Sequence, residues 1–241
     1  MLSGMALRLV ALCVGANDPV RLAGFWAEAL GWDLADDGDG RVRLVPTDPT
    51  SFRMDFLPVP TPKLGQNRHH LDLTTRSLDD QRDSAARFVE LGGCHIDVGQ
   101  TPEEGHIVLA DPEGNELCLI EPTNRFLAGC PRMGAVSCDG SRAVGQFWSA
   151  ALGWPLVWDH DEETAIQAPD GTGPKITWGG PPVNPKLGKN RVHFEVTPVE
   201  ADLVTEVDRL VALGATLTGD GEGGVHMTDP DGNELTVVSP E

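Results

Sequence analysis

Apolar side chains recur with a helical period in four segments of the chain. In the first segment the apolar positions fall at i, i+3, i+4, i+7 and i+8: Leu22, Phe25, Trp26, Ala29 and Leu30. This spacing places the side chains along one face of an α-helix. Comparable stripes occur within residues 77–91, 144–152 and 203–211. The pattern therefore predicts four amphipathic helices.

Strand-like runs separate these helices. In HHLDLTT (residues 69–75) the apolar residues Leu71 and Leu73 alternate with His70, Asp72 and Thr74. RVHFEVT (residues 191–197) alternates in the same way, with His193 and Glu195 on its polar side. A period of two puts alternate side chains on opposite faces of a sheet. We expect the apolar face to pack on helices and the polar face to line a cavity.

Three sequence blocks occur twice, in the same order. FWAEALGW (25–32) returns as FWSAALGW (147–154), PKLGQNRHH (62–70) as PKLGKNRVH (185–193), and DPEGNEL (111–117) as DPDGNEL (229–235). The shifts of 122, 123 and 118 residues indicate a duplicated domain. We place the domains at 1–122 and 131–241, with a linker at 123–130. Each half shows the order strand, helix, three strands twice, which predicts four βαβββ modules.

Four such modules, with DPxGN before the last strand of two of them, resemble the vicinal oxygen chelate superfamily. The PKLGxNRxH block and the FWxxxLGW helix are similar to its glyoxalase-like, bleomycin-resistance-like subgroup. The resemblance implies an α+β fold in which paired modules form two cupped mixed sheets. Helices then lie outside, and a ligand occupies each cup.

The resemblance also implies positions for metal ligands, and this chain departs from them. His70 and His193 match the ligand histidine, but Ala11 and Met133 stand where the other modules would supply one. The position of the last-strand glutamate holds Cys118 in one half and Thr236 in the other. Octahedral and facial-triad sites need three or more nitrogen or oxygen ligands. We therefore expect no metal and no other cofactor, because the ligand set for a divalent ion is incomplete.

The candidate ligand-binding residues are those expected to face the cups. His70 and His193 are also the catalytic candidates, since histidine titrates near neutrality. Asp72 and Glu195 could orient these histidines, but ion pairs with arginine are the alternative role for both. Cys118 could act as a nucleophile or simply as a small apolar side chain. The remaining candidates lie on other strands and could instead belong to the core: Met54, Phe56, Trp178 and Thr236.

The charge of the chain excludes several partners. With 18 Lys and Arg against 37 Asp and Glu, its net charge of −19 disfavours nucleic acids and anionic membranes. Five cysteines without CxxC spacing fit a reducing cytoplasm better than a disulfide framework. Because four modules can complete two cups, either a monomer or a homodimer is expected.

These observations favour a protein that binds a small organic molecule in one or both cups. A metal-dependent lyase, isomerase or dioxygenase of the superfamily is the alternative, and it requires Asp55, Asp72 or Cys118 to complete a site with His70. A non-catalytic scaffold is the third hypothesis, and it applies if side chains fill the cups.

Overall fold

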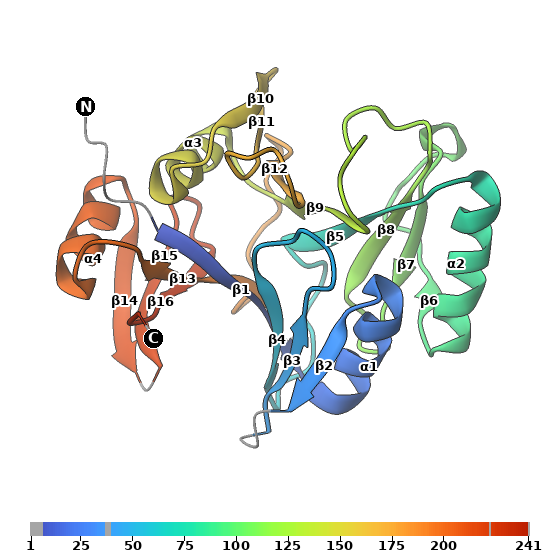
Figure 1. The fold of residues 1–241 in the computed structure, drawn as a ribbon, viewed down its shortest axis with the longest axis horizontal. Coiled ribbons are helices and arrows are strands. Elements are labelled where there is room, and N and C mark those ends of the chain that lie inside the picture. Colours follow the sequence, from blue (N-terminus) through green and yellow to red (C-terminus); the bar gives the residue numbers. More distant parts are fainter. Residues whose placement is uncertain (1–6, 37–39, 222, 241) are drawn as a thin grey trace.

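A computed structural model describes residues 7–36, 40–221 and 223–240, and it shows four βαβββ modules (Figure 1). The first comprises β1 (Leu7–Ala16), α1 (Pro19–Leu30), β2 (Asp33–Asp36), β3 (Val42–Val45) and β4 (Arg53–Pro58). The second comprises β5 (His69–Thr74), α2 (Leu78–Glu90), β6 (Cys94–His95), a 3-10 turn (Pro102–Glu104), β7 (Ile107–Ala110) and β8 (Glu116–Ile120). The third comprises β9 (Met133–Cys138), α3 (Arg142–Leu152), β10 (Leu156–His160), β11 (Glu163–Ile166) and β12 (Lys175–Trp178). The fourth comprises β13 (Val192–Pro198), α4 (Leu203–Ala212), β14 (Thr216–Gly221), β15 (Gly224–Thr228) and β16 (Glu234–Val237).

The strands form two mixed eight-stranded sheets, and each sheet takes one module from each half of the chain. Sheet A has the order β14-β15-β16-β13-β1-β4-β3-β2, and sheet B has the order β10-β11-β12-β9-β5-β8-β7-β6. The first strands of two modules pair antiparallel at each centre, β1 with β13 and β5 with β9. The sequence repeat predicts one cup from the first and second modules and one from the third and fourth. The structure instead pairs the first module with the fourth and the second with the third, which corrects which residues share a cup. We call the face of each sheet opposite its helices cup A and cup B.

The two modules within a half are joined by helix packing and by the DPxGN turn. Phe25 of α1 packs on Phe88 of α2, with their ring centroids 5.4 Å apart. The indole nitrogen of Trp26 donates to the buried carboxylate of Asp111 at 3.0 Å. Glu113 of the same turn accepts hydrogen bonds from the backbone nitrogens ahead of α1. The turn therefore ties the second module to the first.

The second half repeats this joint. Trp148 Nε1 lies 3.4 Å from Asp229, and Asp231 accepts a 2.6 Å hydrogen bond from the backbone nitrogen of Ser141, the N-cap of α3. Trp26 and Trp148 both belong to the core, since each is 3% exposed or less. The two DPxGN blocks therefore link the modules of each half.

Local signals position the helix ends. Ser77 is the N-cap of α2, and its side chain accepts a hydrogen bond from Asp80 N at 3.0 Å. Gly31 takes φ 71° after α1 and so ends that helix in the left-handed conformation that glycine adopts without strain. In the described part of the chain no helix has the length and apolar character to cross a membrane.

Candidate functional site

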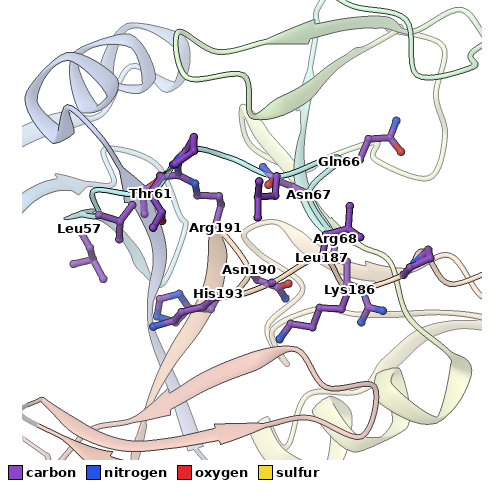
Figure 2. Close-up of a pocket in the computed structure, with 17 residues that line it drawn as sticks. Leu57, Thr61, Gln66, Asn67, Arg68, Lys186, Leu187, Asn190, Arg191 and His193 are labelled. Atoms are coloured by element: carbon purple, nitrogen blue, oxygen red, sulfur yellow. Dashed lines mark hydrogen bonds between the residues drawn. The ribbon is translucent and has the colours of Figure 1, made fainter.

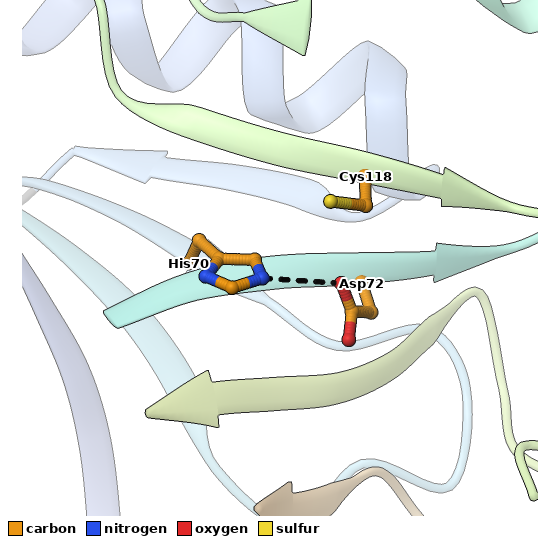
Figure 3. Close-up of side chains that lie close together, drawn as sticks. All are labelled: His70, Asp72 and Cys118. Atoms are coloured by element: carbon orange, nitrogen blue, oxygen red, sulfur yellow. Dashed lines mark ion pairs between the residues drawn. The ribbon is translucent and has the colours of Figure 1, made fainter. Parts of the chain in front are cut away.

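Cup B gathers three of the predicted site residues (Figure 3). His70 and Asp72 lie on β5, and Cys118 lies on the neighbouring β8, directly opposite Asp72 in the strand register. One ligand atom from each of the three lies within 4.8 Å of the others. The alternation of β5 causes this arrangement, because it turns Leu71 and Leu73 into the core and His70 and Asp72 into the cup.

Hydrogen bonds fix the acid of this cluster. The hydroxyl of Ser137, on β9 of the third module, donates to Asp72 Oδ2 at 2.5 Å. His70 Nε2 lies 3.5 Å from Asp72 Oδ1, which forms an ion pair when the imidazole is protonated. Asp72 is thus held by one residue from each module of the sheet. Among the described residues Asp72 contacts His70 and Ser137, and no ion pair joins it to an arginine, the alternative that we considered.

The electrostatics favour the charged pair. Burial by itself lowers the pKa of His70, but hydrogen bonding to Asp72 and Cys118 and the charge of Asp72 outweigh it and raise that pKa. Burial raises the pKa of Asp72, and its contacts with His70 and Ser137 reverse this effect and lower it. At neutral pH the cup therefore holds an imidazolium beside a carboxylate.

Cys118 is a thiol in this setting. Burial raises the pKa of Cys118, and the hydrogen bond to His70 only partly opposes that rise. A protonated thiol is a poor nucleophile and a poor metal ligand. The structure therefore places Cys118 in the cup without giving it the low pKa of a reactive cysteine.

A cavity of about 450 Å³ is lined by His70 and Cys118 of this cluster and by Ser137. Polar groups line it beside His70 and Cys118, among them Arg68, Asp139 and Thr177. Val98, Val108 and the Pro181-Pro182 pair supply apolar walls. A cavity with apolar walls and a few convergent polar groups is typical of a small-molecule site. Cup B is open, so side chains do not fill it as the scaffold hypothesis requires.

Cup A has a different polar arrangement. His193 and Glu195 face it from β13, and Thr236 faces it from β16 opposite Glu195. Glu195 pairs with Arg53 at 3.4 Å, and Arg53 also binds the fully buried Asp55 at 2.8 Å. Burial and then the charge of Asp55 raise the pKa of Glu195. The alternative that we gave for Glu195, an ion pair with an arginine of a neighbouring module, describes this contact.

His193 is isolated within cup A. Its side chain is 9% exposed, and its Nδ1 is buried without a hydrogen-bond partner among the described residues. Burial, followed by the charge of Lys189, lowers the pKa of His193 to about 4. The two histidines that the repeat equates are therefore in opposite states, His70 charged and His193 neutral at pH 7. Two smaller cavities, of about 340 and 200 Å³, lie over this cup.

Three predicted ligand-binding residues do not line either cup. Met54, Phe56 and Trp178 are 1% exposed or less and belong to the hydrophobic core on the helix side of the sheets. The strand phase explains this correction, because Arg53 and Asp55 take the cup side of β4 and Thr177 takes it on β12. The alternation of polar and apolar residues in these two strands indicates which face lines the cup, and the large apolar residues lie on the other face.

The register on β9 also differs from our expectation. Met133 lies opposite Leu73 and is buried in the core, so it does not occupy a ligand position in the cup. Ala135 and Ser137 lie opposite Asp72 and His70 instead. A bulge between Asp72 and Leu73 shifts this register.

The divalent metal that the fold implies can be tested against these residues. Cup B offers one imidazole, one carboxylate and one thiol, and its carboxylate is already shared by His70 and Ser137. An octahedral or facial-triad ion needs more oxygen and nitrogen donors than this. In cup A, His226 and Glu234 line the same cavity as His193, but the described residues include no group of three His, Cys, Asp or Glu ligand atoms close enough together to hold an ion. The residues present do not fit such an ion in either cup.

Comparisons with known proteins agree with this fold. The family model described as Glyoxalase-like domain matches residues 11–120 and 134–238. Glyoxalase I from Zea mays superimposes with a TM-score of 0.66 at 16% identity, covering 98% of this chain and 93% of that one. A mutant of the same enzyme gives a TM-score of 0.67 at 17% identity, with coverages of 98% and 94%.

A putative dioxygenase from Bacillus subtilis gives a TM-score of 0.60 at 13% identity, covering 96% of this chain and 84% of that one. The comparison with curated proteins found no match. At these identities the structural likeness concerns the fold alone. The family model covers most of the chain in two matches, one for each half. The chain therefore belongs to the glyoxalase-like domain family of the vicinal oxygen chelate superfamily, as a tandem duplication of its domain.

Proposed function

We propose that cup B binds a small organic molecule and that the His70–Asp72 pair orients it, without a divalent metal. The observation that carries this proposal is the cavity of about 450 Å³ whose lining includes His70, the partner of Asp72. Cavities of several hundred Å³ are the usual size for small-molecule sites. Cup A lacks a comparable pair, so we assign the function to cup B alone.

The lining indicates the chemistry of the ligand. An imidazolium donates hydrogen bonds and accepts none, so the ligand needs an acceptor such as a carbonyl or phenolic oxygen. Val98, Val108 and the prolines would cover an apolar body of that ligand. Thr177, whose hydroxyl lies 3.1 Å from Ser137 Oγ, extends the polar strip across β12. The site thus suits an amphipathic or aromatic compound with one hydrogen-bonding edge.

A ligand-observed NMR screen of small aromatic carbonyl compounds and phenols tests this proposal. The variants are His70→Gln and the matched His193→Gln, which alters the corresponding histidine of cup A. We expect compounds that bind the wild type and His193→Gln but lose at least about tenfold in affinity for His70→Gln, roughly 1.4 kcal/mol. Equal binding to all three proteins would remove cup B as the site. Thermal unfolding of each variant confirms that it is folded.

A metal-dependent lyase or dioxygenase is the second candidate, because the donor atoms of His70, Asp72 and Cys118 lie within 4.8 Å of one another. Zinc accepts imidazole, carboxylate and thiolate ligands. Zinc binding here has to displace protons from both His70 and Cys118 and separate Asp72 from its partners. Metal content measured after purification without chelator distinguishes the two candidates.

A further inference from the structure

A further cavity, of about 290 Å³, lies between the two copies of the PKLGxNRxH block (Figure 2). Residues 61–68 line one side of it and residues 185–191 line the other, with His193 and the end of β1 between them. The two loops approach each other: a methyl group of Leu187 lies 2.6 Å from where a Cβ on Gly65 would stand, and one of Leu64 lies 3.7 Å from where a Cβ on Gly188 would stand. Each half of the chain therefore contributes the same loop to one site.

The charge of this cavity is opposite to that of the chain. Its lining includes Arg68, Lys186, Lys189 and Arg191, and none of the 17 described residues that line it is Asp or Glu. The whole chain has 37 acidic residues against 18 basic ones. A concave surface lined by one sign of charge concentrates ligands of the other sign.

Backbone carbonyls hold the two guanidinium groups in place, and Arg191 also has an acidic partner. Arg68 donates to Asn184 O and to Asp231 O. Arg191 donates to Gly15 O and to Thr61 O, and it forms an ion pair with Glu113 at 3.9 Å. A carbonyl acceptor fixes the direction of a guanidinium group but carries no charge to balance it. The loops thus preorganise positive charge at the cavity wall.

The two lysines differ in their pairing. Lys186 forms an ion pair with Glu234 at 2.5 Å. Lys189 is exposed, and it has no ion pair or hydrogen bond with any residue in the part of the chain that the structure describes. Lys189 also acts on His193, since it contributes to the lowered pKa of that imidazole. Its ammonium group is therefore close to the site and free to bind a ligand.

His193 gives a second indication of a ligand. More than nine-tenths of it is buried at the wall of the cavity, and its Nδ1 makes no hydrogen bond to a described residue. An orphaned buried polar atom costs about 1 to 3 kcal/mol unless a partner satisfies it. A bound molecule is a candidate for that partner.

The other walls are apolar. Leu57 and Val59 lie at the end of β4, while Leu64 and Leu187 form the rim. The two leucines are 63% and 60% exposed, so each copy of the loop leaves a large apolar side chain in solvent. An apolar body lying between them would cover both.

We propose that this cavity between the repeated loops binds a small organic anion with an apolar body, held by Lys189 and the two anchored arginines. This site is distinct from the binding site proposed in cup B. It does not use His70, Asp72 or Cys118, although its lining shares Gln66, Asn67 and Arg68 with the edge of that cup.

The test is titration of the full chain with anilinonaphthalene sulfonate, an apolar organic anion, followed by fluorescence and calorimetry. Lys189→Glu reverses the free charge, and Arg125→Glu is the matched control because Arg125 is exposed and lies outside the cavity lining. We expect Lys189→Glu to weaken binding at least about tenfold and Arg125→Glu to change it less than about twofold. Raising the salt concentration from about 0.05 to about 0.5 M should weaken wild-type binding more than binding to Lys189→Glu.

Leu187→Asn tests the apolar wall, with Leu217→Asn as its control, since both leucines are more than half exposed. Of these two variants, only Leu187→Asn should weaken binding of the probe. Equal affinity for Lys189→Glu and Arg125→Glu would overturn the proposal, as would loss of binding in His70→Gln, which would place the probe in cup B. Failure of the ligand screen on cup B leaves this test unaffected, because the two sites use different variants.

Discussion

Replacing Asp72 by Asn should lower the pKa of His70 substantially. The carboxylate of Asp72 lies 3.5 Å from His70 Nε2, and it is one of the groups that raise the pKa of the imidazole. Asn has nearly the same shape and keeps an oxygen that can accept from Ser137. The substitution therefore removes the charge and leaves the packing of the cup almost unchanged.

The size of the effect follows from the distance and the exposure. Two unit charges about 4 Å apart interact by about 4 kcal/mol near a protein surface and by about 1 kcal/mol in bulk water. The His70 side chain is 35% exposed and that of Asp72 is 16% exposed, so the pair lies between these limits. An interaction of about 2 kcal/mol corresponds to about 1.5 pKa units, since one unit is about 1.36 kcal/mol.

Two-dimensional NMR of the histidine rings, recorded across a pH titration, measures this shift. The His70 signal is assigned from its absence in His70→Gln. His193 serves as an internal control, because it lies in cup A and burial lowers its pKa to about 4. Asp220→Asn, an exposed substitution with the same change of charge, controls for the overall field of the protein. A His70 pKa that changes by less than about 0.3 units in Asp72→Asn would refute the ion pair as the cause of the raised value.

Three further outcomes are expected. First, because folding raises the pKa of His70, the stability that the pair contributes should be fully present below about pH 6.5 and be lost as the pH rises through the folded pKa. Urea unfolding of the wild type and Asp72→Asn should show that their difference in unfolding free energy shrinks as the pH rises from 6 to 10. A difference that grows with pH would contradict a raised pKa of His70. Second, Asp111→Ala should lower the free energy of unfolding by about 3 kcal/mol, since it removes the buried acceptor of Trp26 Nε1 and of Asn115. Asp111→Asn should lower it by less, and equal stability of the two variants would show that these hydrogen bonds do not stabilise the fold. Third, iodoacetamide should label the exposed Cys94 faster than Cys118, because burial raises the pKa of Cys118. Peptide mass spectrometry measures the order of labelling, and faster labelling of Cys118 would indicate a thiolate.

Local periodicity predicted the modules because helices and strands are each encoded over a few residues. The stripe at Leu22, Phe25 and Trp26 became α1, and the alternation around His70 and Asp72 became the polar face of β5. That alternation placed His70 and Asp72 on the cup face, and the resemblance to the superfamily placed Cys118 there, at the position of its last-strand glutamate. The core of the candidate site was therefore accessible from the sequence.

Pairing between modules was not accessible in the same way. Nothing in the sequence of β5 indicates that β9 pairs beside it, because strand pairing depends on contacts between distant segments. As a result, Ser137 was missed as the partner of Asp72, and Arg53 was missed as the partner of Glu195. Met54 and Phe56 were placed in the cup for a different reason, since aromatic and apolar residues suit both a ligand site and a core. The repetition of PKLGxNRxH was visible, but only the structure shows that the two copies face each other.

Metal and ligand content of the same preparation tests the central claim most directly. The protein is purified without chelator or affinity metal and measured by plasma mass spectrometry for Fe, Mn, Ni and Zn and by native mass spectrometry for bound organic molecules. The wild type and His193→Gln are compared with His70→Gln. We predict no metal near one equivalent in any sample and an organic adduct, retained from the cell or added from the screen, that only His70→Gln loses. Near-stoichiometric metal in the wild type that disappears in His70→Gln would contradict the account and identify cup B as a metal centre.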